Sequence, residues 1–278
     1  MAVMRWTIGV VQMDCALGDS ARNVAKIGRF AALASSLGVD LAVFPECCTT
    51  GYFLGSRLEG LAEPPDGPTS KKLAAIARDN RLYMAVGAYT RRDDGLYNSQ
   101  LLYGPDGRHL ATYDKAHLFA GERALCRAGD RPVVVETPIG RIGMTICYDL
   151  IFPDYVRHLV DLGADFLINS TDWITDAYQR GTWGWAGPTT QALASTRALE
   201  NLTFLAMANR VGHENATPEL VFESFGYSCV TGPSGKVLAS IAEGEGIAVA
   251  RIDVSAEDYG RWTAIATYKG DRRPELLR

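Results

Sequence analysis

The sequence predicts a layered α/β fold, and three observations support this prediction. Segments with strand-like apolar patterns alternate along the chain with segments whose apolar residues recur at helical spacing. Several of the expected strands are apolar throughout, which is typical of strands buried on both faces. Turns rich in glycine and proline join other strands into hairpins. Because no repeat, low-complexity segment or linker interrupts this order, we expect one domain over residues 1–278.

The N-terminal half is expected to supply strands that end next to reactive side chains. Apolar residues at helical spacing define its first helix, and Thr69 is expected to cap the second. The strand before Glu46 is short and wholly apolar, and the strand before Lys115 follows a Gly-Pro-Asp-Gly turn. The expected order is strand, helix, strand, helix and three strands, over residues 6–13, 23–37, 41–44, 69–80, 83–89, 96–103 and 110–113.

The C-terminal half repeats the alternation and then turns to sheet. A strand pair leads directly to Cys147, and Pro153 suits the first position of the next helix, where its missing N–H costs nothing. The last three strands include a pair joined by a Pro-Ser-Gly turn. We expect strands over residues 133–136, 141–146, 166–169, 203–209, 228–231, 237–241 and 247–252, and helices over residues 153–162 and 189–200.

Three short segments each end an expected strand and each carry one reactive side chain. Glu46 follows Phe-Pro, Lys115 follows Tyr-Asp, and Cys147 precedes Tyr-Asp. A carboxylate acts as a general base, a thiol as a nucleophile, and an ammonium as a fixed positive charge for a developing oxyanion. These three groups together predict acyl transfer at an unactivated carbonyl, and we expect that carbonyl to belong to an amide.

The three residues, in this order, resemble the Glu-Lys-Cys triad of the carbon-nitrogen hydrolase (nitrilase) superfamily. The resemblance covers nearly the whole chain, with further family-like segments at residues 8–13, 44–46, 50–52, 115–119, 121–122, 143–149, 197–201, 208–210, 225–228 and 271–276. It implies a four-layer α-β-β-α sandwich, which the apolar pattern alone does not predict. It also implies that Glu46 is the base, Lys115 the oxyanion donor and Cys147 the nucleophile, with no metal or organic cofactor.

The same resemblance suggests roles for residues around the triad. Glu122 is expected to be a second active-site carboxylate that orients the lysine and the substrate amide. A sharp turn after the nucleophile would aim the backbone N–H of Tyr148 at the substrate oxygen. Trp173, from an aromatic stretch over residues 173–188 that could also form a lid or a subunit contact, is expected to be a pocket wall opposite Tyr52 and Phe53.

The other thiols near the triad are expected to have no chemical role. Cys47 and Cys48 lie beside the proposed base but not at the family's nucleophile position, so we interpret them as packing or pocket-wall residues. The ammonium of Lys115 is expected to lower the pKa of the Cys147 thiol from about 8.5 and so favour the thiolate.

Several alternatives stay open. A Cys-His hydrolase would use His117 as the base, since His117 lies two positions from Lys115; otherwise His117 is a structural residue of that loop. The Cys-Tyr-Asp sequence resembles amidases and carbamoylases more than nitrilases, which typically carry Cys-Trp-Glu. An N-carbamoyl (ureido) hydrolase is therefore the next substrate class, ahead of a nitrilase. A binding protein that retains the fold without turnover is the remaining alternative.

Composition and charge exclude other classes of function. The 278 residues are 47% hydrophobic and 22% charged, which is ordinary globular composition. The net charge is −4 and the basic pairs are scattered, so we expect no nucleic-acid partner. No apolar run approaches the ~20 residues of a spanning helix, so we expect no membrane partner. The four histidines show no metal-ligand spacing, so we expect no metal site.

The cysteines and the C-terminus lead to expectations about location and assembly. The six cysteines include no Cys-x-x-Cys, and the N-terminus has no signal-peptide stretch, so we expect a cytoplasmic protein with plain thiols. The resemblance implies a homodimer or larger assembly, with the C-terminal tail, about residues 254–278, at a subunit interface. The expected small-molecule partner is an amide.

Overall fold

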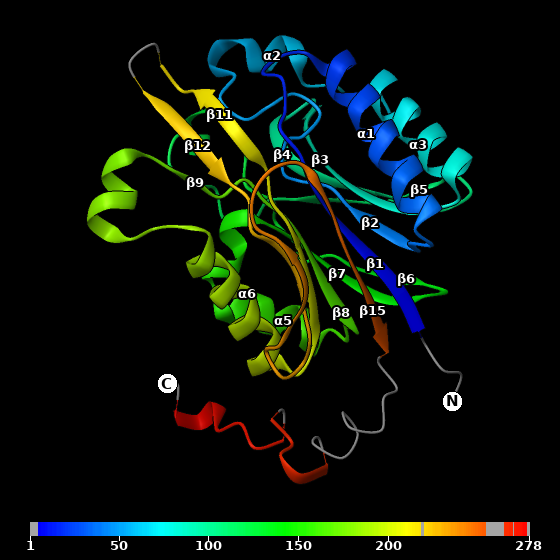
Figure 1. Ribbon diagram of the computed structural model, residues 1–278, viewed down its shortest axis with the longest axis vertical. Coiled ribbons are helices and arrows are strands. Elements are labelled where there is room, and N and C mark those ends of the chain that lie inside the picture. Colours follow the sequence, from blue (N-terminus) through cyan, green and yellow to red (C-terminus); the bar gives the residue numbers. More distant parts are fainter. Residues whose placement is uncertain (1–4, 218–219, 254–263, 269, 277–278) are drawn as a thin grey trace.

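We describe the protein from a computed structural model that places residues 5–217, 220–253, 264–268 and 270–276. Two six-stranded sheets pack against each other, and pairs of helices cover their outer faces (Figure 1). One core cluster contains side chains from both sheets, including Ile8, Val10, Met144 and Leu205, all of which are fully buried. The sheets are therefore held together by apolar burial along their common face.

The first sheet is mixed. Strands β1, β2 and β3 run parallel to one another, while β15, β4 and β5 add antiparallel strands at the two sides. The strand order is β15-β1-β2-β3-β4-β5. The bounds are β1 (Arg5–Gln12), β2 (Leu41–Val43), β3 (Tyr83–Arg92), β4 (Gly95–Tyr103), β5 (His109–Asp114) and β15 (Gly246–Asp253).

The second sheet has the same plan. Its central strands β7, β8 and β10 are parallel, and β6, β13 and β14 are antiparallel additions. The order is β14-β13-β10-β8-β7-β6. The bounds are β6 (Val134–Thr137), β7 (Gly140–Ile146), β8 (Phe166–Ser170), β10 (Phe204–Ala208), β13 (Ser228–Thr231) and β14 (Val237–Ile241).

Four long helices form the outer layers and complete an α-β-β-α sandwich. Helices α1 (Ser20–Ser36) and α3 (Pro68–Asn80) lie on the first sheet, where their apolar faces share a core cluster with β1, β2 and β3. Helices α5 (Pro153–Asp161) and α6 (Gly187–Asn201) lie on the second sheet (Figure 1). The four-layer fold predicted from the family resemblance is confirmed.

A third, small sheet was not predicted from the sequence. It has the order β11-β12-β9, with bounds β11 (Val211–Asn215), β12 (Val221–Phe225) and β9 (Ile174–Thr175). In Figure 1 the β11–β12 hairpin projects at one end of the sandwich. The remaining described elements are short: η1 (Gly55–Arg57), α2 (Leu58–Leu61), α4 (Glu122–Leu125), η2 (Cys147–Ile151), η3 (Gln179–Trp183) and η4 (Pro274–Leu276).

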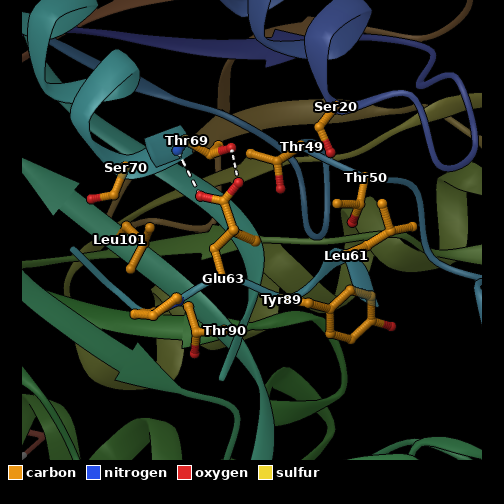
Figure 2. A pocket seen from close by; sticks show the side chains of 12 residues that line it. Ser20, Thr49, Thr50, Leu61, Glu63, Thr69, Ser70, Tyr89, Thr90 and Leu101 are labelled. Carbon is orange, nitrogen blue, oxygen red and sulfur yellow. Dashed lines mark hydrogen bonds between the residues drawn. The ribbon is translucent and has the colours of Figure 1, made fainter. Parts of the chain in front are cut away.

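The predicted helix starts differ from the structure for local reasons. Helix α1 begins three residues early, because the Asp19 side chain accepts a hydrogen bond from the Arg22 N–H and caps it. The prediction that Thr69 caps α3 is wrong. Pro68 occupies the first turn, and the Glu63 carboxylate accepts hydrogen bonds from the Thr69 N–H (2.6 Å) and hydroxyl (2.9 Å), as Figure 2 shows. A carboxylate from the preceding loop therefore replaces the expected cap.

The predicted interface tail lies largely outside the described residues, which include 264–268 and 270–276 of it. In this part Arg272 pairs with Asp161 at the end of α5, with 2.7 Å between the guanidinium and the carboxylate. The described part of the tail thus contacts the helical layer on the second sheet.

Candidate active site

Glu46, Lys115 and Cys147 meet where three strands end. Glu46 follows β2 and Lys115 follows β5 in the first sheet, while Cys147 follows β7 in the second. The Glu46 N–H donates to the carbonyl of Thr171 just past β8, which joins the two sheets at this point. Gly87 of β3 lets the Glu46 loop approach, because a Cβ there would lie 2.3 Å from the Pro45 oxygen. Residues far apart in the sequence therefore share one buried site.

Lys115 is clamped between two carboxylates. Its ammonium donates to Oε1 of Glu46 and to Oε2 of Glu122, both at 2.7 Å. The side chains of Lys115 and Glu46 are fully buried, and that of Glu122 is 3% exposed. Glu122 begins α4 and also accepts the N–H of Phe119 at 2.7 Å. The structure thus brings the predicted second carboxylate into direct contact with the lysine.

The charges in this cluster set one another's pKa. Burial acts to lower the pKa of Lys115, but the negative charges of Glu46 and Glu122 outweigh it and hold that pKa well above its usual value. Burial raises the pKa of Glu46 to about 7, against the opposing effect of Lys115 and with a further upward push from Glu122. The lysine therefore stays charged, while Glu46 exchanges a proton near neutral pH.

Cys147 sits at a strained turn between β7 and η2. Its φ is +43°, an uncommon conformation for a residue with a side chain. Its sulfur lies 4.0 Å from the carbonyl oxygen of Asp172, and the Asp172 N–H donates to Oε2 of Glu46 at 2.9 Å. The backbone of Asp172 thus contacts both the thiol and the carboxylate and places them on the same side of the site.

The expectation that Lys115 makes Cys147 a thiolate is wrong for the free site. Burial and the charge of Glu46 raise the pKa of the Cys147 thiol well above its usual value, and the lowering effect of Lys115 is smaller than these two. This direction favours the neutral form of the Cys147 thiol, so a reaction at its sulfur would need a base. Glu46, with its pKa of about 7, is placed for that role.

The backbone after Cys147 begins a helical turn. Tyr148 is the second residue of η2, so its N–H has no acceptor within that turn. Asp149 holds the turn in place, because its Oδ2 accepts the N–H of Ile146 at 2.9 Å. The Tyr148 side chain packs edge-on against Phe119 and Phe152. The N–H predicted to bind the substrate oxygen is thus in the first turn of η2, and its oxyanion role stays a prediction.

The ring of His117 is engaged away from the thiol. Its Nδ1 bonds Oδ1 of Asp149 at 2.8 Å, and it stacks on Phe152 with 3.8 Å between ring centroids. These contacts support the structural interpretation of His117 and leave Glu46 as the carboxylate beside Cys147.

A cavity of about 240 Å³ opens beside the charged cluster. Tyr52 and Phe53 line it, and Phe53 stacks on Phe222 of β12 with 5.1 Å between centroids. Glu122 both lines the cavity and bonds Lys115, so the cavity and the charged cluster share this side chain. Its other lining residues are Leu54, Gly55, Tyr89, Phe119, Ala120, Gly121, Leu125, Cys126, Ile174 and Ala216.

The side chains of two predicted substrate-binding residues lie elsewhere, although Tyr148 was predicted to act through its backbone N–H. The Tyr148 side chain lines a separate hollow with His117 and Phe152. Trp173 is 4% exposed and packs edge-on against Trp185 in the core between the sheets. Neither side chain lines the cavity, so contact of either with a substrate stays a prediction. Cys47 and Cys48 are fully buried in two core clusters, which agrees with a packing role.

Sequence reasoning missed four residues that shape the site. Asn98 of β4 donates to both carboxylates of the cluster, and Asp172 contacts both the base and the thiol. Glu214 of β11 accepts the N–H groups of Tyr52 and Phe53, and Phe222 completes the aromatic wall. The β-branched and aromatic residues within 221–225 could have indicated the strand that carries Phe222, but no local pattern pairs it with Phe53.

Two other kinds of feature, a metal-binding cluster and a membrane-spanning helix, are absent from the described part of the chain. There, no group of His, Cys, Asp and Glu side chains is arranged to hold a metal ion. No helix of that part has the length and apolarity needed to cross a membrane.

Comparisons with known proteins agree with this geometry. The carbon-nitrogen hydrolase family profile matches residues 7–261. A mutant of the amidase from Nesterenkonia sp. AN1, with the acetamide moiety of fluoroacetamide added covalently at its active-site cysteine, has a similar structure. It superposes with a TM-score of 0.81 at 25% identity and covers 98% of this chain and 95% of that one.

Curated relatives carry both amidase and nitrilase names. An (R)-stereoselective amidase of Pseudomonas sp. is 34% identical over 89% of this chain and 85% of its own length. The 2-oxoglutaramate amidase of Bacillus subtilis is 30% identical over 90% and 92% of the two chains. A nitrilase of Pyrococcus abyssi is 30% identical over 96% and 97%. On the profile, the fold and the buried Glu-Lys-Cys site together, the chain belongs to the carbon-nitrogen hydrolase family of the nitrilase superfamily.

Proposed function

We propose that the protein hydrolyses a small-molecule amide to a carboxylic acid and ammonia through a thioester on Cys147. The observation that carries this proposal is the buried Lys115, held at 2.7 Å by Glu46 and Glu122 beside a thiol on a strained turn. A buried cation that is fixed by two anions is pre-organised to stabilise a new negative charge without moving.

The proposed first half-reaction forms the thioester. Glu46 takes the thiol proton as the sulfur attacks the amide carbon, and the carbonyl oxygen becomes an oxyanion. Lys115 has three N–H donors, of which the two carboxylates use two, so one is left for the oxyanion beside the Tyr148 N–H. Glu46 then returns the proton to the leaving nitrogen, and ammonia departs as the C–N bond breaks.

The second half-reaction reverses the roles. Glu46, ionised again, takes a proton from water while the water oxygen attacks the thioester carbon. The tetrahedral intermediate uses the same oxyanion donors, and its collapse breaks the C–S bond. The proton on Glu46 returns to the sulfur, which restores the neutral thiol that burial favours.

The cavity favours a small, uncharged acyl group. Its volume of about 240 Å³ lies below the range of about 300–1,000 Å³ that is typical of drug-sized ligands. Among its described lining residues no Lys, Arg or His is present, and the one acidic side chain, Glu122, is engaged with Lys115. A carboxylate on the substrate, as the name of the Bacillus subtilis relative implies, would be buried there without a partner. The same reasoning disfavours N-carbamoyl amino acids.

Ammonia release from matched substrates tests the proposal. We expect turnover of simple aliphatic and aryl amides, slower turnover of the matching ureido acids and nitriles, and no turnover by Cys147→Ala. Faster nitrile hydrolysis would replace the amidase assignment with a nitrilase. Absence of turnover on all three classes, with no acyl adduct on Cys147 by mass spectrometry, would leave a binding protein.

We place this activity in the cytoplasm. All six cysteines are unpaired and buried in the structure, which is expected where thiols stay reduced.

A further inference from the structure

Asn98, like Lys115, bridges the two carboxylates of the site. Its side-chain nitrogen donates to Oε1 of Glu46 and to Oε1 of Glu122, both at 2.6 Å. The residue is fully buried in β4, and its backbone oxygen accepts the N–H of Lys115 at 2.8 Å. One residue therefore contacts all three charged members of the cluster.

The charges of Glu46, Glu122 and Lys115 do not balance, so the hydrogen bonds from Asn98 to the two carboxylates matter for the stability of the cluster. Two carboxylates face one ammonium, so with all three groups ionised the buried cluster carries one excess negative charge. Like charges at close range in a buried site disfavour double ionisation. The Lys115 ammonium donates to Oε2 of Glu122 and leaves Oε1 without a charged donor. Asn98 donates to that Oε1, so its amide forms a second bridge between the two carboxylates. Its two amide hydrogens match the two carboxylates in number.

The orientation of the Asn98 amide is determined by its surroundings. The reverse orientation would point the amide oxygen at two carboxylates, where it could only repel them. In the observed orientation the oxygen lies 3.5 Å from the Cys47 sulfur, which donates its S–H to it. Cys47 is fully buried and has a φ of +48°. The Cys47 thiol, which packs beside Glu46, therefore has a specific contact. Its S–H donates to the Asn98 amide oxygen, while the Asn98 amide nitrogen donates to Glu46.

We propose that Asn98 is a positioning residue for hydrolysis: it spaces Glu46 and Glu122 around Lys115 and favours the ionised form of Glu46 by donating to its carboxylate. The proposal rests on the proposed function for its catalytic meaning, but the thiol chemistry that it predicts needs no amide turnover. Removing the two donors destabilises the ionised form of Glu46, so more base is needed to activate Cys147.

The test compares Asn98→Leu with Gln100→Leu. Gln100 is a matched control, because it is two residues along the same strand, on the same face, fully buried and bonded through its amide to Ser170 instead of the cluster. Iodoacetamide alkylation of Cys147, followed by peptide mass spectrometry from about pH 5 to 9, reports base-assisted activation of the thiol. Ammonia kinetics on a small amide provide the second readout.

The expected result is a shift of the alkylation profile of Asn98→Leu to higher pH by about one to two units, the effect of losing hydrogen bonds to a charged group. We also expect kcat to fall roughly 10²-fold with KM changed little, as misplacement of a catalytic group produces. Gln100→Leu should lose stability in chemical denaturation without a shift of the profile.

An unshifted profile in Asn98→Leu, or an equal shift in Gln100→Leu, would overturn the proposal and reduce Asn98 to a packing residue. If Asn98→Leu does not fold by circular dichroism, Asn98→Ser and Gln100→Ser provide the same comparison. The serine hydroxyl lies at the position of the Asn98 Cγ, one bond short of the amide nitrogen, so a shift of similar size is expected in Asn98→Ser. If the wild type released no ammonia from any amide, the proposed function would fail, while the alkylation profiles would still decide the role of Asn98.

Discussion

Replacing Lys115 by methionine should remove both catalysis and a large share of stability, in a manner that depends on pH. The substitution conserves most of the side-chain volume and deletes the ammonium that both carboxylates contact at 2.7 Å. These side chains are fully buried or nearly so, so the substitution removes one partner of a buried ion pair and leaves the other partners without it. Such losses are about 3–5 kcal/mol.

The pH dependence follows from the carboxylates that remain. The pKa of Glu46 is about 7 with Lys115 in place, and without the cation it rises further, so the folded variant takes up protons. A pKa that is higher in the folded than in the unfolded state adds stability below the unfolded value, and this stability is lost as pH rises through the folded value. The loss in Lys115→Met should therefore be larger at pH 8 than at pH 5.

Urea denaturation followed by circular dichroism at both pH values measures this effect, with Lys26→Met as the control. Lys26 pairs with Glu245, whose side chain is 41% exposed, so its removal should cost about 1 kcal/mol or less. Ammonia release by Lys115→Met should fall at least ~10²-fold. A stability loss equal to that of Lys26→Met, or one that is the same at both pH values, would refute the assigned electrostatics.

Four further outcomes are expected. Cys147→Ala should keep the wild-type circular dichroism and lose turnover, and in the wild type a trapped acyl mass should map to this residue and not to another thiol. Activity of the wild type should rise as pH increases through about 7, the pKa of Glu46, and Glu46→Gln should lose at least ~10²-fold and this rising limb; a limb centred near the usual carboxyl pKa would contradict the assignment. Phe222→Ala removes the ring stacked on Phe53, so KM for aryl amides should rise by roughly tenfold at most while kcat for a small aliphatic amide is retained; equal losses on both would indicate a folding defect. The chain should form a homodimer or larger assembly through α5, α6 and the C-terminal tail, where Leu162 and Leu199 are 47% and 40% exposed, and a stable 30 kDa particle in light scattering at micromolar concentration would argue against it.

The sequence by itself determined most of the scaffold and the three central groups of the site. The wholly apolar strand before Glu46 and the apolar strand before Cys147 indicate strands that are buried on both faces. Order along the chain and the family-like segments then predict which carboxylate is the base, which lysine stabilises the oxyanion and which thiol is the nucleophile. These are local signals, because each depends on a few consecutive residues.

Tertiary structure decided the environment of those groups. Asn98, Asp172 and Phe222 each contact a residue 50 or more positions away, and no short sequence pattern predicts such pairs. Burial reversed the expected pKa shift of the Cys147 thiol, because the cost of removing a thiolate from water exceeds the benefit of a nearby ammonium that two carboxylates already neutralise. A residue's type and neighbours along the chain are properties of the sequence, whereas its dielectric surroundings are created by the folded chain.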